Sequence, residues 1–271
     1  LNLPPYSVNY FKNPLWLGLV QQLPKINRVI REEHQLAKNW AKIYAFDHII
    51  CDNRLGLRSP EVHSIYMTHQ LRLKQGGLSN LGSRCHAYFY SQFDEIWVPD
   101  APESPLSGSL SNHKNNHLPP IHFVGHPSRF SYAEERLTPD GDIVFLLSGP
   151  EPLRTQWEQE LIEQAQNLQE HSFHLIRGSQ EGPAISPTAN VKVDDWLSGE
   201  DLENALRSSA LIIARSGYST LLDLVNIPKP LVVFPTPGQG EQLYLAEYLS
   251  EKGQVLMADA KHFDIKKLIV E

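Results

Sequence analysis

The stretch IIARSGYSTLLDLV, residues 212–225, decides the fold because it joins an apolar run to the start of a helical pattern. Residues 212–214 indicate the end of a buried strand, and residues 219–225 carry the spacing of an amphipathic helix. Arg215, Ser216 and Gly217 lie between them. A cation, a hydroxyl and a glycine where a helix begins suit a bound phosphate, because helix N-termini offer free N–H groups to anions. The alternative is a plain turn with a capping serine and a solvent-facing arginine.

The helix after this turn adds two polar side chains to the same corner. Thr220 provides a second hydroxyl, and Asp223 follows Ser219 by about one helical turn, where its carboxylate can reach a ribose diol. The corner therefore offers groups for both the phosphate and the ribose of a nucleotide.

Two further strand-to-helix corners are polar and flexible. They lie in residues 143–159 and 234–249, and their candidate ligand-binding residues are Ser148, Gly149, Gln239, Glu241 and Gln242. Pro150 has no N–H to donate, so the first of these corners is a weaker phosphate cradle than a glycine-rich loop. Ligands of open α/β sheets bind beyond the carboxyl ends of the strands. Three such corners together predict a site for a nucleotide-shaped ligand.

Short apolar runs alternate with helical stretches along the chain. Ten runs indicate strands, at residues 48–51, 63–68, 95–99, 121–125, 143–148, 173–178, 191–197, 211–216, 230–236 and 254–259. Helical spacing is found in residues 153–169, 198–209 and 240–252, the second with a capping-box pattern at Ser198 and Asp201. Several runs do not alternate, which is typical of parallel strands buried on both faces. We therefore predict an α/β fold with parallel sheets.

Charge is unevenly distributed along the 271 residues, whose net charge is −7. Residues 1–130 have a net charge of +4 and residues 131–271 one of −11. A polar stretch containing Pro and Gly lies at the change, so we expect domains at residues 1–128 and 142–271 joined by a linker at 129–141. The positive half suggests an anionic ligand, with ordinary surface variation as the alternative. The polar, unperiodic segment 100–120 indicates a mobile loop of the first domain or a disordered insert.

Composition argues against several classes of protein. Hydrophobic residues make up 41% of the chain, enough for a sizeable core. No run approaches the ~20 apolar residues of a membrane-spanning helix, and no signal peptide is visible. No basic stripe with interleaved aromatic residues indicates nucleic-acid binding. Cys51 and Cys85 are interpreted as free thiols, so we expect a cytoplasmic protein.

Two segments of the second half resemble a known family. ARSGYSTLLDL (214–224), followed by PLVVFPTPGQGEQ (230–242), is similar to the donor-binding domain of GT-B glycosyltransferases, in particular family 28, which includes MurG. The resemblance implies two Rossmann-like domains facing a cleft, with a UDP-sugar bound to the second. By this match the diphosphate and ribose contacts are Arg215, Ser216, Gly217 and Asp223, and the sugar contacts are Gln239, Glu241 and Gln242.

The first half resembles the acceptor domain of the same family more weakly. The matching segments are HIICDNRLGLRS (48–59), IYMTHQL (65–71) and HFVGHPSRF (122–130). The first strand and glycine-rich loop of that domain, which often carry a catalytic residue, have no counterpart here. We therefore expect the first domain to be incomplete at its N-terminus.

Candidate catalytic and acceptor-side residues lie in these segments. Asp52 is a candidate general base for an acceptor hydroxyl, and His69 is a second catalytic candidate. The acceptor-side and linker candidates are Asn53, Arg54, Gln70 and Arg129. The alternatives are a loop cap for Asp52 and Asn53, a structural histidine for His69, and a solvated linker arginine for Arg129.

The predicted function is metal-independent transfer of a sugar from a UDP-sugar, with UDP-GlcNAc as the candidate donor, to an acceptor hydroxyl. No cofactor and no metal site are expected, because the histidines lack the spacing of metal ligands. A lipid-linked acceptor at the membrane surface would fit the positive first half, with contacts around Trp16; an ordinary packed helix is the alternative there. Other readings are a nucleotide-sugar epimerase or hydrolase on the same fold, or a non-catalytic nucleotide-sugar-binding protein.

Overall fold

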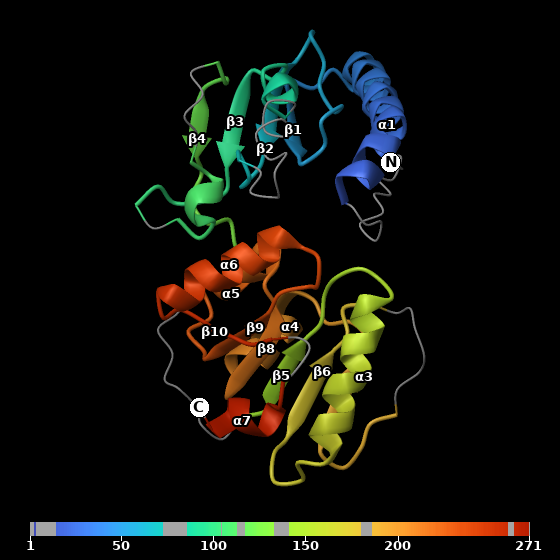
Figure 1. Ribbon diagram of the computed structural model, residues 1–271. Coiled ribbons are helices and arrows are strands. Elements are labelled where there is room, and N and C mark those ends of the chain that lie inside the picture. The colour runs from blue at the N-terminus through green and yellow to red at the C-terminus, as the bar shows by residue number, and fades with distance from the viewer. Residues whose placement is uncertain are drawn as a thin grey trace. The chain divides into compact units, whose positions relative to one another are not determined.

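The computed structural model describes residues 3, 15–72, 86–103, 105–112, 117–132, 141–179, 186–259 and 263–270, with the backbone alone for residues 15–23 and 270. The chain divides into two compact units, Leu1–Pro127 (unit 1) and Ser128–Glu271 (unit 2). Each unit is an α/β body of its own, and both are shown in Figure 1.

Unit 1 contains a four-stranded parallel sheet whose strands follow one another in the order β1-β2-β3-β4. The strands are β1 (His48–Asp52), β2 (His63–Met67), β3 (Glu95–Val98) and β4 (Ile121–Phe123). Asp52 pairs with Met67, Met67 with Trp97, and Trp97 with His122. This register places the carboxyl ends of all four strands at the same edge of the sheet.

The long helix α1 (Leu15–Tyr44) precedes this sheet. Its buried residues include Ile30, Glu33, Ala37 and Ala41, which recur every three or four positions and so form one face of the helix. The sheet packs its own apolar side chains, including Tyr66, Phe93 and Ile96, into a separate cluster with Cys51. A buried carboxylate on the packed face of α1 is unusual, and its partners belong to the candidate site described below.

Unit 2 contains a six-stranded parallel sheet in the order β10-β9-β8-β5-β6-β7. Its strands are β5 (Ile143–Leu146), β6 (Phe173–Ile176), β7 (Val191–Asp194), β8 (Leu211–Arg215), β9 (Leu231–Phe234) and β10 (Leu256–Met257). Its helices are α3 (Leu153–Gln166), α4 (Gly199–Arg207), α5 (Tyr218–Leu224), α6 (Gly240–Glu251) and α7 (Ile265–Val270). In strand order β8 lies between β5 and β9, so the corners that follow these three strands are neighbours.

Both faces of the unit 2 sheet are covered, which explains the continuous apolar runs of its strands. On one face Phe145 and Ile213 pack in a cluster with Trp157 and Leu161 of α3. On the other face, Val144 and Ile212 pack in a second cluster, which also contains residues of α4 and α5. Because side chains alternate along a strand, Arg215 points to the same face as Ile213, toward α3.

The predicted α/β class with two parallel sheets is confirmed, and a strand lies in each of the ten predicted runs. The predicted capping box is wrong: Ser198 precedes α4 in an extended conformation but forms no side-chain cap hydrogen bond. The interpretation of segment 100–120 is also incomplete, because Leu110 in η1 (Gly108–Leu110) is fully buried. Cys85 lies outside the described residues.

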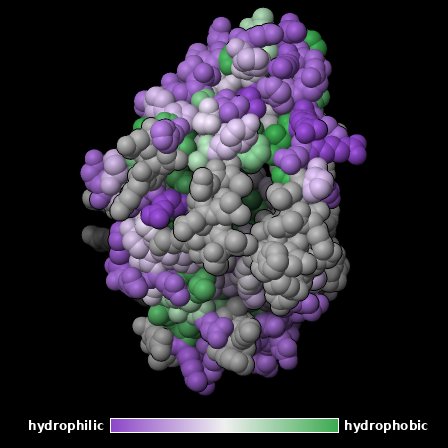
Figure 2. Space-filling model, turned by 45° about the horizontal axis from the view of Figure 1, so that its top comes forward, coloured by the Kyte–Doolittle hydropathy of each residue, from purple (hydrophilic) through white to green (hydrophobic). Residues whose placement is uncertain are grey.

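Among the coloured residues of the face seen in Figure 2, hydrophilic ones predominate and hydrophobic ones form scattered patches. Across the helices described, none combines the length and the apolar character needed to span a bilayer.

Candidate functional site

One glutamine joins the carboxyl ends of β8 and β9. Gln242, in the first turn of α6, accepts a hydrogen bond at Oε1 from the backbone N–H of Thr236 over 2.8 Å. Its Nε2 donates to Oε1 of Gln239 over 2.7 Å, and its carbonyl oxygen accepts from Oγ of Ser216 over 2.8 Å. The loops after two neighbouring strands are therefore tied together. Both Gln242 and Ser216, predicted as ligand contacts, are buried and bound to the protein in this structure.

Arg215 ends β8 with its side chain buried rather than facing solvent. Only 3% of the residue is exposed. Its Nη1 donates to the carbonyl oxygen of Pro235 over 3.2 Å, and its guanidinium lies 4.0 Å from the centre of the Trp157 ring. Burial lowers the pKa of Arg215 to about 10, so it keeps its proton at neutral pH. Within the described ranges no carboxylate forms an ion pair with this cation.

Two more buried polar atoms near Arg215 lack a partner within the described residues. They are Oγ1 of Thr236 and Nε1 of Trp157, whose residues are 3% and 2% exposed. A Cβ added to Gly149 would lie 4.0 Å from Oγ1 of Thr236, so the corner between β5 and α3 borders this threonine. Buried polar groups are normally paired. This region therefore combines a buried cation with two polar atoms that lack partners among the described residues.

A pocket of about 530 Å³ opens beside the loop between β9 and α6. Its lining consists of Pro235, Thr236, Pro237, Gly238, Gln239, Gly240, Leu243, Met257 and Asp259. This volume lies within the range of small-molecule sites, and the pocket shares Thr236 and Gln239 with the hydrogen-bond network around Gln242.

The other predicted contacts of this region are partly accessible. Gly217 precedes α5 with φ −69° and ψ 139°, and a Cβ there would approach nothing closer than 3.7 Å. The fold therefore does not require a glycine at this position. Thr220 and Glu241 are half-buried in the first turns of α5 and α6.

The corner between β5 and α3 carries a carboxylate of its own. Ser148 is half-buried and Gly149 is exposed with a φ of 110°. Glu151 accepts a hydrogen bond from the backbone N–H of Thr155, in the first turn of α3, and forms an ion pair with Arg154. Burial acts to raise the pKa of Glu151, but hydrogen bonds from Thr155 and Arg154 outweigh it and hold this pKa below its usual range.

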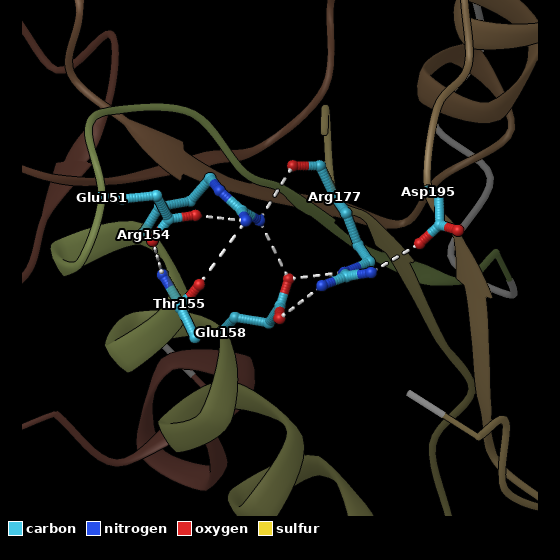
Figure 3. Close-up of polar contacts among 6 residues, drawn as sticks. All are labelled: Glu151, Arg154, Thr155, Glu158, Arg177 and Asp195. Carbon is cyan, nitrogen blue, oxygen red and sulfur yellow. Dashed lines mark hydrogen bonds and ion pairs between the residues drawn. The ribbon is translucent and has the colours of Figure 1, made fainter. Parts of the chain in front are cut away.

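Beneath this corner lies a buried ion network, shown in Figure 3. The carboxylate of Glu158 is inaccessible and accepts hydrogen bonds from Arg154 over 3.1 Å and from Arg177 over 2.8 and 3.1 Å. Arg177 also pairs with Asp195 over 2.6 Å. Hydrogen bonds from Arg177 to Glu158 raise the pKa of Arg177 above its usual value. The network fixes α3 to the ends of β6 and β7.

Two predicted ligand contacts bind each other. The backbone N–H of Arg129 donates to Oδ1 of Asp223 over 3.1 Å, and its guanidinium donates twice to Oδ2, over 2.9 and 2.6 Å. Oγ of Ser128 donates to the carbonyl oxygen of Asp223 over 3.1 Å. Here Asp223 anchors the start of unit 2 to α5, and a ribose contact would have to share this carboxylate with Arg129.

In unit 1, Asp52 at the end of β1 and Asn53 at the start of the following loop are exposed to solvent. Asn53 has a φ of 53°, a left-handed conformation that is uncommon without glycine. Its N–H donates to the carbonyl oxygen of Met67 over 3.2 Å, which holds the loop against β2.

Glu33 of α1 also holds this loop in place. Its carboxylate pairs with Arg54 and accepts from the backbone N–H of Gly56 over 3.1 Å. The thiol of Cys51 donates to the carbonyl oxygen of Arg54 over 2.6 Å, and burial raises the pKa of this thiol to about 12. Arg54, predicted as an acceptor-side contact, is thus engaged with the helix. Sequence reasoning missed Glu33 because acidic residues on helices are usually solvated.

His69 and Gln70 follow β2 after one intervening residue, Thr68, and are half-buried. The N–H of Gln70 donates to Oγ1 of Thr68 over 3.1 Å, and its carbonyl oxygen accepts from the Tyr90 hydroxyl over 3.1 Å. Since β1 and β2 are parallel neighbours, His69 shares the sheet edge with Asp52. The structure thus brings the two catalytic candidates to one edge of unit 1.

Asp100 and His126 follow β3 and β4 at this edge, and neither is among the residues predicted from the sequence. The carboxylate of Asp100 is inaccessible and accepts from the N–H groups of Leu106 and Ser107 over 2.7 and 2.8 Å. Nε2 of His126 lies 2.9 Å from its Oδ1. The available signal was an aspartate directly after a strand, followed by Ser and Gly, a pattern typical of a carboxylate that organises a turn. In the part of the chain described, no three His, Cys, Asp or Glu side chains form a metal-binding group.

Comparison with known proteins bears on unit 2 most directly. Residues 156–271 match the glycosyltransferase family 28 C-terminal domain. This match begins in α3 and includes the corners after β8 and β9, so the resemblance inferred from the ARSGYSTLLDL and PLVVFPTPGQGEQ segments is confirmed.

One relative carries the name UDP-N-acetylglucosamine–N-acetylmuramyl-(pentapeptide) pyrophosphoryl-undecaprenol N-acetylglucosamine transferase 1 and comes from Bacillus thuringiensis. It is 20% identical over 129 residues, which are 44% of this chain. The matched region spans about a third, 35%, of the relative's length.

Solved glycosyltransferase structures share the fold of the chain. SnogD from Streptomyces nogalater aligns with a TM-score of 0.62 at 17% identity, over 99% of this chain and 77% of its own. The spinosyn rhamnosyltransferase SpnG, in complex with thymidine diphosphate, aligns with a TM-score of 0.57 at 15% identity, over 93% and 72%. MurG of Acinetobacter baumannii aligns with a TM-score of 0.50 at 14% identity, over 90% and 69%. At these identities the likeness shows the fold, which is of the GT-B type.

Proposed function

We propose that this protein is a glycosyltransferase that binds a UDP-sugar in unit 2 and transfers the sugar to an acceptor hydroxyl held by unit 1. The observation that carries the proposal is the buried cation at the end of β8, which has a carbonyl and an indole ring as neighbours but no carboxylate ion pair among the described residues. A buried charge without a counter-charge destabilises a protein. A bound diphosphate would supply the missing counter-charge for Arg215, together with partners for Thr236 and Trp157. The family match of unit 2 supports a nucleotide-sugar as the ligand.

The proposed reaction is a single displacement at the anomeric carbon. The acceptor oxygen attacks this carbon and loses its proton to a base, and the bond from the carbon to the diphosphate oxygen breaks as UDP leaves. We propose Asp52 or His69 as the proton acceptor, because both lie at the carboxyl edge of the unit 1 sheet, where α/β proteins bind their ligands. Arg215 would neutralise the charge that develops on the leaving diphosphate, and no metal ion takes part in the proposed step.

UDP-GlcNAc and a lipid-linked acceptor are the finer part of the proposal. They rest on the positive charge of residues 1–130 and on the Bacillus relative, whose name contains both UDP-N-acetylglucosamine and an undecaprenol carrier. The corresponding location is the cytoplasm, at the membrane surface.

Calorimetric titration with UDP tests the donor site. Arg215→Met keeps most of the apolar stem beside Trp157 but removes the charge, and it should weaken UDP binding about ten- to a hundredfold, the effect of losing a charge-assisted phosphate contact. Arg215→Lys, which keeps the charge, is the matched control and should retain more affinity.

Thermal unfolding of both variants separates loss of the contact from loss of the fold. If folded Arg215→Met binds UDP with the affinity of the parent, the nucleotide does not bind at Arg215. If UDP binds and the sugar appears only as free sugar with every acceptor tried, the chain is a hydrolase on the same fold.

A further inference from the structure

The N-terminus of α3 already holds an anion that belongs to the protein. Glu151 is an exposed residue that lies two positions before this 14-residue helix, and its carboxylate accepts from the N–H of Thr155 over 3.3 Å. It also pairs with the guanidinium of Arg154, which Glu158 holds from the opposite side (Figure 3). The hydrogen bonds that lower the pKa of Glu151 keep this carboxylate ionised at neutral pH.

The same corner borders the region where a ligand is needed. Gly149, two residues before Glu151, lies against Thr236, whose buried Oγ1 has no partner among the residues described. Trp157, on the next turn of α3 after Arg154, lies under the guanidinium of Arg215. A diphosphate that meets Arg215 and Thr236 therefore approaches a corner where two carboxylates, Glu151 and Glu158, share the guanidinium of Arg154.

We propose that Glu151 is a specificity-determining residue of the donor site, which disfavours free nucleoside diphosphate relative to nucleoside diphosphate sugar. The inference rests on the proposed function of unit 2. The terminal phosphate of UDP has a second ionisation near pH 6, whereas esterification by the sugar removes it, so at pH 7.5 UDP carries close to one more negative charge. Glu151 therefore repels the product, UDP, more strongly than the donor, and this repulsion favours release of UDP after transfer.

The test is calorimetry at pH 7.5 with UDP, UDP-GlcNAc and uridine, on the parent chain, Glu151→Gln and Asp195→Asn. Asp195 is the matched control, since it is a comparably exposed carboxylate on the same ion network, bound to Arg177 beyond Glu158. Glu151→Gln should tighten UDP about fivefold, the size of one like-charge contact in water. It should tighten UDP-GlcNAc less and leave uridine unchanged, and Asp195→Asn should alter none of the three.

A second variant and thermal unfolding keep the result interpretable. Glu151→Asp retains the charge and should keep the parental ratio of UDP to UDP-GlcNAc affinity. The inference is overturned if folded Glu151→Gln keeps the parental ratio of UDP to UDP-GlcNAc affinity, or if it binds both ligands equally more weakly. In either case, binding of UDP by the parent leaves the proposed function intact. If neither the parent nor any variant binds a uridine nucleotide, the proposed function fails and this inference fails with it. UDP binding by Glu151→Gln alone would support both.

Discussion

At the scale of single residues, the contacts between α1 and the loop after β1 leave no space for even a methyl group. A Cβ on Gly56 would lie 2.3 Å from the carbonyl oxygen of Ile30 and 2.6 Å from Cβ of Glu33. We expect Gly56→Ala to lower the free energy of unfolding by about 1–3 kcal/mol, as overpacking of a close contact does. Urea denaturation measures this difference.

The control for that substitution is Gly217→Ala, because a Cβ there has 3.7 Å of clearance and its φ of −69° suits any residue. Gly217 is the N-cap of α5, where alanine is less favourable than glycine, so the loss in free energy of unfolding should be at most about 1 kcal/mol and smaller than for Gly56→Ala. Equal stability of Gly56→Ala and the parent would show that α1 and the loop do not pack as described.

The sequence predicted where candidate site residues lie along the chain better than it predicted where their side chains point and what they contact. The sequence located Arg215 at a strand end, because an apolar run stops there. Its burial against Trp157 depends on α3, whose placement on the sheet is a matter of tertiary packing. The pairing of Asp223 with Arg129 joins residues that are 94 positions apart, and no local pattern reports such a contact. Glu33 was missed in the same way, because its partners Arg54 and Gly56 lie 21 and 23 positions away. Asp100, in contrast, binds the nearby Leu106 and Ser107 and had a local signal.

At the scale of elements, the hydrogen bonds of Gln242 hold the loop between β9 and α6 in place. Gln242→Leu leaves the buried N–H of Thr236 without its acceptor, which should cost about 1–3 kcal/mol of stability. The same substitution should weaken UDP binding, because the loop that lines the pocket loses its anchor. Urea denaturation and calorimetry measure the two effects.

Leu243→Ala, on the next position of the same helix, is the control, since Leu243 is 42% exposed. It should change the free energy of unfolding much less than Gln242→Leu. If Gln242→Leu keeps both the stability and the UDP affinity of the parent, Gln242 does not hold the loop that lines the pocket.

Elements were the most predictable level, for a physical reason. The central strands β5, β8 and β9 are short and mostly apolar because both sheet faces are covered, so their signal does not depend on distant contacts. Helix ends were less predictable: Ser198 has the residue type and the extended backbone of a cap, but its side chain makes no cap bond. The segment around Leu110 lacked periodicity because Asp100, and not a repeating pattern, organises it.

At the scale of the whole molecule, the boundary between the units follows Pro127, and the next residues pack on unit 2. Phe130 is 4% exposed and lies in the cluster of Leu202, Leu224 and Ile227. A fragment of residues 128–271 should therefore be more stable than one of residues 142–271 by about 3–5 kcal/mol, the usual cost of losing a buried phenylalanine. Urea denaturation of the two fragments measures the difference.

Phe130→Ala in the longer fragment is the matched control and should remove most of the advantage. If both fragments unfold at the same urea concentration, residues 129–141 are a linker that contributes nothing to unit 2, as the charge break suggested. The predicted linker at residues 129–141 rests on a polar stretch rich in Pro and Gly, and such a pattern does not reveal which of its residues are buried.

The stacking of Arg215 on Trp157 also gives unit 2 an optical reporter. A cation 4.0 Å from an indole ring influences how that ring emits light, and a phosphate that neutralises the cation changes the electric field across it. Occupancy of the site should therefore appear in the intrinsic fluorescence of one of the five tryptophans, without any label. Trp157→Phe should abolish the change in fluorescence on ligand binding, which would identify Trp157 as its source.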